Sequence, residues 1–312
     1  MNLADKRICV TGGAGFLGSH VVNHLRLMGC SKIFVPRVEK YDLRRRDDVE
    51  KMYHDAQPQV VIHLAATVGG IGANRSFPGK FFYDNAIMGM EMMDVGRLFG
   101  IEKFVQMGSA CEYPAFAPVP TQETDVWSGL PEGSNAPYGV AKRALLIQGQ
   151  AYRAQYGMSV IHILSTNLYG PGDNFDLSTS HVIPAIISRC MTAKETNAPS
   201  ITMWGTGRAT RDFIFVKDAA EGIIQATESY DASMPINIGS GQEISILEIT
   251  NRIRNVVGFN GSVLWDVSKP DGQARRLLDI TRARSFGFEP KTTLEKGIRE
   301  TVAWYVQSRS AL

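Results

Sequence analysis

Tyr138 and Lys142 have the residue types and the spacing that proton transfer to a carbonyl oxygen requires. They lie four positions apart in NAPYGVAKRALL, so on a helix both side chains would share one face. A free phenol has a pKa of about 10, and a nearby ammonium group would lower this pKa toward neutrality. Ser109 follows the apolar run IEKFVQM, which predicts a buried strand, and its hydroxyl could donate a second hydrogen bond. Together the three residues could stabilise a carbonyl oxygen while hydride arrives at its carbon.

Cys111 lies two residues beyond Ser109 in MGSACEYP. A buried cysteine is usually only a small hydrophobic residue. This cysteine, however, is predicted just past the end of a strand, where ligands bind in open α/β sheets. The residues alone therefore leave two interpretations, a packed thiol and a reactive one. Glu112 follows directly, and its carboxylate would raise the pKa of the thiol if the two groups were close.

The segment KRICVTGGAGFLGSHVVNHLRLMGC predicts a nucleotide-binding turn. A short strand, ICV, is followed by Gly12, Gly15 and Gly18 and then by apolar residues at helical spacing. The glycines let the backbone approach a pyrophosphate, and the helix N-terminus supplies N–H groups and a partial positive charge. After the next predicted strand, KIFVP, Arg37 stands where NAD-binding proteins carry an acidic residue, although Glu39 is close. We therefore predict a dinucleotide site, and Arg37 favours the 2′-phosphate of NADP over NAD.

These residues must be positioned by strands that alternate with helices. VVIHLAA predicts a buried strand, another is expected over 103–107, and helices are expected over 85–99 and 138–156. This alternation predicts a parallel sheet with right-handed crossovers. We expect VGGIGANRS to form a glycine-rich loop over the site, and His63 to be a packed and hydrogen-bonded side chain.

The alternation of strands and helices ends after STNLYGP, where Pro171 and Gly172 predict irregular chain. The predicted fold class is α/β, with a Rossmann-like doubly wound parallel sheet and a smaller α/β C-terminal substrate domain. Residues 1–168 should form the dinucleotide-binding domain, to which some later segments return. Residues 169–312 should form the substrate-binding region.

Composition limits the classes of function. The chain has 312 residues, of which 44% are apolar, and a net charge of +2, so nothing in its overall charge indicates nucleic acid. The run from Arg44 to Arg46 is typical of a solvated surface. The four cysteines have no CxxC spacing and no accompanying histidine cluster, so we expect no metal site. We see no room for a signal peptide and no apolar run near the roughly 18 residues of a membrane span, and we expect a cytoplasmic protein with free thiols.

Nine segments in this order resemble the extended short-chain dehydrogenase/reductase superfamily. Within it, the chain is similar to the GDP-L-fucose synthase family, the GDP-4-keto-6-deoxy-D-mannose 3,5-epimerase/4-reductases. The matching segments run through nearly the whole chain: VTGGAGFLGS, HLAATVGGI, GSACEYP, NAPYGVAK, STNLYGPGDNF, SHVIPA, WGTGRATRDF, INIGSG and SKPDGQARRLLD.

The resemblance favours the reactive interpretation of Cys111. Enzymes of this family invert two carbons before they reduce a third, using a cysteine two residues after the active-site serine and a histidine that opens the HVIPA motif, His181 here. Two carbons of a 4-keto sugar are α to the carbonyl, so inversion needs proton-handling groups on opposite sides of the ring. The implied catalytic residues are Ser109, Cys111, Tyr138, Lys142 and His181.

The resemblance also implies contacts to NADP, with NAD as the alternative. Some relatives carry a basic residue inside the glycine-rich turn, where this chain has Ala14, which leaves Arg37 as the main support for NADP. The implied cofactor-binding residues are Gly12, Gly13, Ala14, Gly15, Phe16, Leu17, Gly18, Arg37, Leu64, Ala65, Ala66, Met107, Gly108, Tyr138, Lys142, Ser165, Asn167, Leu168 and His181.

A nucleotide-sugar substrate is implied as well. Arginine side chains suit a diphosphate, an aromatic ring can pack on the nucleotide, and a carboxylate could accept from a guanine edge or a ribose hydroxyl. By analogy with relatives, the helices over 85–99 and 138–156 could form a homodimer interface. The implied substrate-binding residues are Ser109, Asn167, Arg189, Trp204, Arg211, Asp271 and Arg276.

Three alternatives remain open at this point. The first is an epimerase or reductase acting on another nucleotide 4-keto sugar, such as a 6-deoxyheptose. The second is an NAD-dependent nucleotide-sugar 4-epimerase, which would need neither Cys111 nor His181. The third is a dinucleotide sensor without catalysis, which would not need Tyr138 and Lys142.

Overall fold

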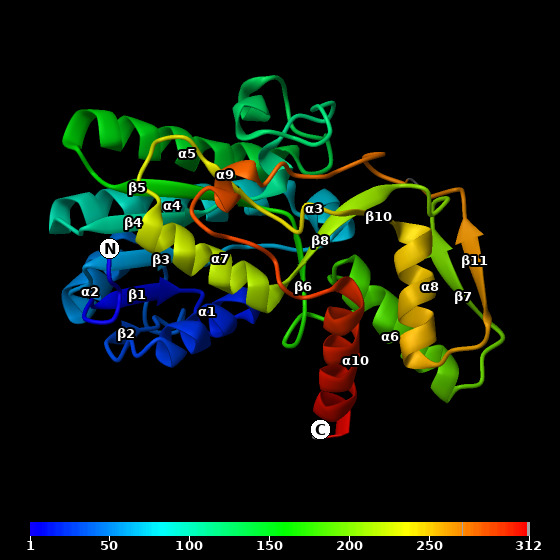
Figure 1. Cartoon of the computed structure of the whole chain (residues 1–312). Coiled ribbons are helices and arrows are strands. Elements are labelled where there is room, and N and C mark those ends of the chain that lie inside the picture. The colour runs from blue at the N-terminus through cyan, green and yellow to red at the C-terminus, as the bar shows by residue number, and fades with distance from the viewer. Residues whose placement is uncertain (270, 311–312) are drawn as a thin grey trace.

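The computed structural model describes residues 1–269 and 271–310, so Pro270 of the SKPDGQARRLLD segment and the last two residues lie outside the described chain. A six-stranded parallel sheet in the order β2-β1-β3-β4-β5-β9 forms its larger part (Figure 1). The strand bounds are β1 Ile8–Thr11, β2 Ile33–Phe34, β3 Val60–His63, β4 Lys103–Met107, β5 Val160–Ser165 and β9 Ile236–Ile238. The strands β1, β3, β4 and β5 are buried along their whole length, as expected where helices cover both faces of a parallel sheet.

Helices cover both faces of this sheet and make it a three-layer structure (Figure 1). The helices on one face pack against each other and are α2 Arg46–Ala56, α4 Pro78–Phe99 and α5 Ala136–Tyr156. Those on the other face are α1 Phe16–Leu27 and α7 Val216–Ser229. Separate apolar clusters fill the two spaces, one with Val21, Leu25 and Ile223, the other with Met92 and Phe104. The prediction of a Rossmann-like α/β fold is confirmed.

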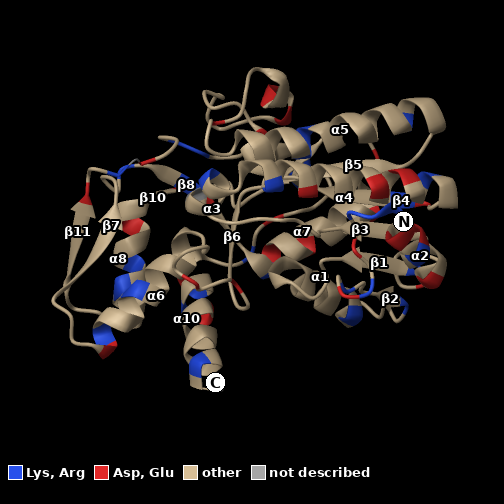
Figure 2. Ribbon diagram, turned by 180° about the vertical axis from the view of Figure 1, so that it is seen from behind, with Lys and Arg blue, Asp and Glu red and all other residues tan. Residues whose placement is uncertain are grey.

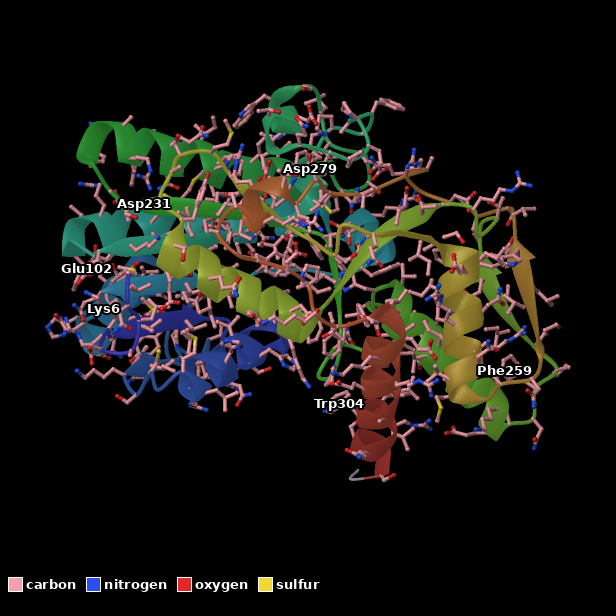
Figure 3. The ribbon with its side chains drawn as sticks, in the orientation of Figure 1. Lys6, Glu102, Asp231, Phe259, Asp279 and Trp304 are labelled. Carbon is pink, nitrogen blue, oxygen red and sulfur yellow. The ribbon has the colours of Figure 1, made fainter. Side chains whose placement is uncertain are left out.

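The smaller part contains a mixed three-stranded sheet in the order β10-β8-β6 and a parallel pair, β11-β7. Its core is a third apolar cluster, and Figure 3 shows Phe259 of that cluster at the end far from the large sheet. The strands are β6 Asn167–Tyr169, β7 Ser200–Trp204, β8 Thr210–Phe215, β10 Glu243–Ser245 and β11 Ser262–Asp266. The remaining helices are α3 Ile71–Ser76, α6 Val182–Glu195, α8 Ile246–Val257, α9 Thr281–Arg284 and α10 Leu294–Ser310, with the 3-10 turns η1 Ala110–Glu112 and η2 Glu123–Trp127. Among the described residues, no helix is both long and apolar enough to cross a membrane.

Three local predictions need correction. The segment VGGIGANRS is not a loop throughout, because its last six residues form the helix α3. The helix expected over 85–99 begins seven residues earlier, at Pro78, whose fixed φ and missing N–H suit a first helical position. The strand expected in KIFVP pairs with β1 over only Ile33 and Phe34.

Charged side chains of both signs are interspersed over the two parts of the chain (Figure 2). At the amino-terminal edge of the strands, Lys6 Nζ lies 2.5 Å from Glu102 Oε2, and Figure 3 shows the two residues together. The carboxyl ends of the strands lie at the opposite edge, where the loops turn toward the smaller part. Any ligand bound by an open parallel sheet is expected at that second edge.

Candidate active site

A cavity of about 1180 Å³ opens at the carboxyl edge of the large sheet and continues to the smaller part. Its volume exceeds the roughly 300–1000 Å³ that is typical of a site for one drug-sized ligand. The cavity therefore has room for two ligands side by side. All residues named above as catalytic, cofactor-binding or substrate-binding line it, with the exception of Gly13. A Cβ on Gly13 would lie 2.8 Å from the Val10 oxygen and 2.9 Å from a Val35 methyl carbon, so this glycine serves packing beneath the turn.

The glycine-rich turn fits a dinucleotide pyrophosphate. Gly12 adopts φ +68°, and a Cβ there would lie 2.8 Å from the backbone nitrogen of Ala65. A Cβ on Gly18 would lie 2.0 Å from the Gly12 oxygen, so only glycine allows α1 to pack this closely on the turn. Helix α1 begins at Phe16, which lines the cavity, and its first N–H groups have no side-chain cap. Such a helix end favours an anion.

Two arginines line the cavity where the ribose of a bound dinucleotide is expected. Arg37 Nε lies 4.0 Å from Glu39 Oε2, and both side chains are largely exposed at the cavity rim. Arg44 also lines the cavity, and its Nη2 lies 2.7 Å from Asp42 Oδ2. The sequence interpretation of Arg44 as a solvated surface residue missed this position. Arg37 and Arg44 are the basic groups that could meet a 2′-phosphate.

Tyr138 and Lys142 lie in the first two turns of α5 and line the cavity together with Ser109. Lys142 is only 1% exposed, its Nζ donates to the Met107 carbonyl at 2.9 Å, and it lies 5.9 Å from the centre of the Tyr138 ring. Burial lowers the pKa of Lys142 to about 8. The expected lowering of the Tyr138 pKa is not found: burial raises this pKa well above its ordinary value, with smaller contributions from Cys111 and Glu112. The phenol is therefore protonated at neutral pH and can donate.

His63 is packed, as predicted. It is 1% exposed, and its Nδ1 lies 2.8 Å from Thr11 Oγ1. Burial and the nearby Lys142 lower the pKa of His63 to about 3. Its imidazole is therefore neutral at any physiological pH and belongs to the sheet interior.

Cys111 lies in η1, directly after β4, and is half-buried at the cavity wall. Its N–H donates to Ser109 Oγ at 3.2 Å, and Arg276 Nη1 lies 3.7 Å from its sulfur. The carboxylate of Glu112 is directed into the interior, toward the Ser109 N–H and His162, rather than toward the cavity.

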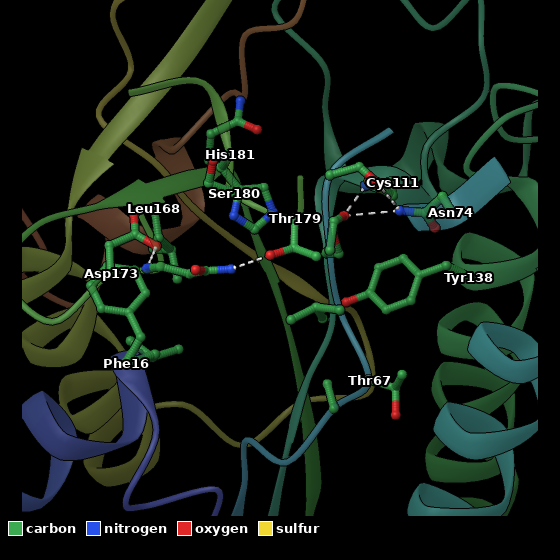
Figure 4. Close-up of a pocket in the computed structure, with 18 of the residues that line it drawn as sticks. Phe16, Thr67, Asn74, Cys111, Tyr138, Leu168, Asp173, Thr179, Ser180 and His181 are labelled. Atoms are coloured by element: carbon green, nitrogen blue, oxygen red, sulfur yellow. Dashed lines mark hydrogen bonds between the residues drawn. The ribbon is translucent and has the colours of Figure 1, made fainter. Parts of the chain in front are cut away.

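His181 lies on the other side of the cavity, directly before α6 (Figure 4). The cavity gives solvent access to its ring, yet the surrounding protein lowers its pKa below the ordinary value by desolvation. A neutral imidazole at neutral pH can accept a proton. The segment before it is held by Asn174, whose Nδ2 donates to Thr179 Oγ1 at 2.8 Å. Cys111 and His181 thus face the same space from opposite walls.

The part of the cavity farther from the large sheet is rich in positive charge. Burial, and then the neighbouring Arg276, lower the pKa of Arg211 to about 10, so an anionic ligand would relieve crowded positive charge. Trp204 at the end of β7 is 55% exposed, so its ring is accessible to a ligand in the cavity. Arg189 also lines the cavity. Asp271 accepts from the Thr206 N–H at 2.6 Å and from its hydroxyl at 2.8 Å, so it holds the loop after β7.

Sequence reasoning also missed Asn74 and Asp173, polar residues of the cavity that are labelled in Figure 4. Asn74 of α3 is 7% exposed, and its Nδ2 donates to the carbonyls of Gly69 and Gly70. Asp173 is 8% exposed, and burial raises its pKa to about 7. The PGDN turn directly after β6 was a signal for Asp173, because polar residues at strand ends line such sites.

Comparisons with known proteins agree with this geometry. The model of the NAD dependent epimerase/dehydratase family matches residues 8–239. The chain is 41% identical to a GDP-L-fucose synthase from Sinorhizobium fredii over 306 residues, which cover 98% of this chain and 97% of that protein. A solved GDP-L-fucose synthetase from Naegleria fowleri bound to NADP is 29% identical with a TM-score of 0.91, over 99% and 95% of the two chains. A GDP-6-OMe-4-keto-L-xylo-heptose reductase from C. jejuni is 27% identical with a TM-score of 0.92, over 99% of both chains.

Proposed function

The chain belongs to the NAD dependent epimerase/dehydratase family, and from this we propose that it converts GDP-4-keto-6-deoxy-D-mannose to GDP-L-fucose. The reaction would invert C3 and C5 and then reduce C4 at the expense of NADPH. The observation that carries this proposal is the position of Cys111 and His181 on opposite walls of the cavity that also holds Ser109, Tyr138 and Lys142 (Figure 4). A reductase alone would need neither the thiol nor the imidazole.

The proposed inversion uses these two walls. One of Cys111 and His181 takes the proton from a carbon next to the carbonyl, and the other returns a proton to the opposite face, so no proton is gained or lost overall. Ser109 and Tyr138 donate hydrogen bonds to the oxygen that becomes negative in the enolate. The lowered pKa of His181 suits the accepting role at neutral pH.

The proposed reduction uses the other set of groups. NADPH, when bound, supplies the hydride that C4 receives. Tyr138, protonated because burial raises its pKa, gives its proton to the C4 oxygen. Lys142 stabilises the phenolate that remains, and its ammonium group can also hold a ribose hydroxyl of the cofactor. The turn at Gly12 and the N-terminus of α1 would hold the pyrophosphate.

NADP is the proposed cofactor in preference to NAD. Arg37 and Arg44 are the basic groups near the expected 2′-phosphate, and the Naegleria fowleri relative was solved with NADP. Arg211 and Arg276 would bind the diphosphate of the sugar nucleotide, and Trp204 would pack on its base.

We also expect a homodimer through α4 and α5, which expose the apolar side chains of Phe82, Tyr83, Met90 and Ile147. Light scattering after gel filtration would measure the mass of the particle.

Mass spectrometry of the product formed in deuterium oxide tests the proposed function. The enzyme is given NADPH and GDP-4-keto-6-deoxy-D-mannose. Net reduction together with two solvent deuterons on carbon is expected, because each inversion exchanges one carbon-bound proton. Reduction without deuterium would make the protein a keto-reductase. A reaction only with a GDP-linked 4-keto heptose would move the substrate toward that of the C. jejuni relative.

A further inference from the structure

A buried contact between a carboxylate and an imidazole lies next to the turn that carries Ser109 and Cys111. Glu112 is 0% exposed and His162 of β5 is 3% exposed. His162 Nε2 lies 3.1 Å from Glu112 Oε1 and 3.0 Å from Oε2. A buried carboxylate is costly unless it is hydrogen-bonded, so the groups that hold Glu112 determine whether this charge can lie here.

Glu112 fixes the backbone of the catalytic turn. Its Oε1 accepts the Ser109 N–H at 2.8 Å, while Ser109 Oγ accepts the Cys111 N–H at 3.2 Å, and the two contacts form a capping box. The strand end above the pair must be glycine: a Cβ on Gly108 would lie 2.3 Å from His162 Nε2 and 2.4 Å from Glu112 Oε1. The side chain of Glu112 therefore determines where the hydroxyl and the thiol lie.

The charge of Glu112 is not cancelled by His162. Among the described residues, Nδ1 of His162 has no hydrogen-bond partner. A doubly protonated ring would leave a buried N–H donor without an acceptor, whereas the tautomer with its proton on Nε2 donates to the carboxylate and leaves only a lone pair unmatched. In that tautomer the imidazole donates a hydrogen bond to the carboxylate without carrying a charge of its own.

Besides His162 of β5, the titratable and charged groups near the Glu112 carboxylate come from helix α5 and from the turn itself. Helix α5 contributes Tyr138, Lys142 and Arg143, whose Nε donates to the Glu112 carbonyl at 3.0 Å. The turn itself contributes Cys111, with Arg276 on the far side of its sulfur, and Tyr113 follows. Of the cations, Lys142 is the one that is fully buried, so it depends most on a buried partner of opposite charge.

We propose that Glu112, held by His162, is a positioning residue of the active site that fixes Ser109 and Cys111 and supplies the buried negative charge that keeps Lys142 protonated. The direction of the pKa shifts agrees. Burial lowers the pKa of Lys142, and Glu112 opposes that shift; Glu112 also adds to the raised pKa of Tyr138. Removal of the negative charge lowers both pKa values, so the ammonium and the phenol would each lose their proton at a lower pH.

The pH profile of kcat/KM for NADPH in Glu112→Gln tests this proposal, which uses the reaction of the proposed function as its readout. Glutamine keeps an oxygen for the Ser109 N–H but removes the charge. We expect the alkaline limb of the profile to move down by about one pH unit. Glu123→Gln is the matched control, because Glu123 is also buried and accepts a backbone N–H, that of Asn237, but it belongs to η2 and not to the turn that carries Ser109 and Cys111.

A second variant covers the case in which Glu112→Gln does not fold. His162→Leu removes the donor that holds the Glu112 carboxylate in place, so the alkaline limb of this variant should move in the same direction by a smaller amount. An unmoved limb with a uniformly lower rate would overturn the proposal and leave Glu112 a purely structural residue. An equal movement in Glu123→Gln would also overturn it. The pH dependence of the NADPH dissociation constant, measured in the same variants, reports the charge of Lys142 even if the sugar proves to be a different one.

Discussion

The two sides of the cavity are built differently. Where the nicotinamide end of the cofactor is expected, the side chains come from regular elements and are nearly inaccessible: Lys142 on α5 is 1% exposed and Ser165 at the end of β5 is 5% exposed. On the substrate side, Trp204 is 55% exposed, and His181, Asp271 and Arg276 come from segments between helices and strands. From this difference we expect the sheet to fix the hydride chemistry of the proposed reaction, and the loops to select the sugar nucleotide.

Tyr138→Phe would affect the cofactor side most strongly. It removes only the hydroxyl, so hydride transfer should fall about 10³-fold through loss of the proton donor, while NADPH binding stays within about twofold. Rates of NADPH oxidation and the NADPH dissociation constant are the measurements. Tyr152→Phe is the control on the same helix, because the Tyr152 hydroxyl donates to Asp94 outside the cavity. Equal losses in both variants would mean that the helix, and not the phenol, is responsible.

Much of the cofactor side could be predicted from sequence because its signals are local. The strand, glycine turn and helix around Gly12 are consecutive, and the spacing of Tyr138 and Lys142 alone places both on one face of α5. The parallel sheet followed from the alternation of strands and helices. Periodicity and local spacing are therefore sufficient to predict this side of the site from the sequence.

The missed features depend on contacts between distant segments. Helix α3 is only six residues long, and its entry is held by the Gly70 N–H, which donates to the Thr179 carbonyl at 3.1 Å. The Glu112–His162 contact requires the pairing of β4 with β5, which sets His162 beside Gln106. The raised pKa of Tyr138 results from burial, which spacing along one helix does not reveal. Such properties appear only once the chain is folded.

Cys111→Ser would distinguish proton exchange from ketone reduction, because Cys111 lies between the cofactor side and the substrate side of the cavity. Proton exchange at C3 and C5 should fall about 10²-fold, because a hydroxyl exchanges protons far less readily than a thiol. Reduction of a ketone that is already epimerised should fall much less. Deuterium incorporation and NADPH oxidation, measured on the two substrates, give the two rates. Cys30→Ser, a buried cysteine outside the cavity, is the control, and equal losses of both rates in Cys111→Ser would show that the thiol only shapes the wall.

The pH dependence of NADPH use should reveal the burial of Lys142. Its pKa in the folded chain is lowered to about 8, so the ammonium is present below this pH and is lost as the pH rises through it. We expect kcat/KM for NADPH to fall about tenfold for each pH unit above about 8. Lys142→Arg should remove this limb, because a guanidinium stays protonated. A wild-type profile that stays flat to pH 10 would contradict the assignment of a buried, charge-dependent lysine to the cofactor side.

Trp204→Ala would test the substrate side with the smallest expected effect. An exposed ring that packs on a base contributes about 1–3 kcal/mol, so KM for the sugar nucleotide should rise about tenfold while kcat changes little. Trp127→Ala removes an equally large exposed ring outside the cavity and should leave KM unchanged. A fall in kcat equal to the rise in KM would mean that Trp204 also orients the sugar for reaction. The contrast would then weaken, because the loops would contribute to the chemistry as well as to the choice of substrate.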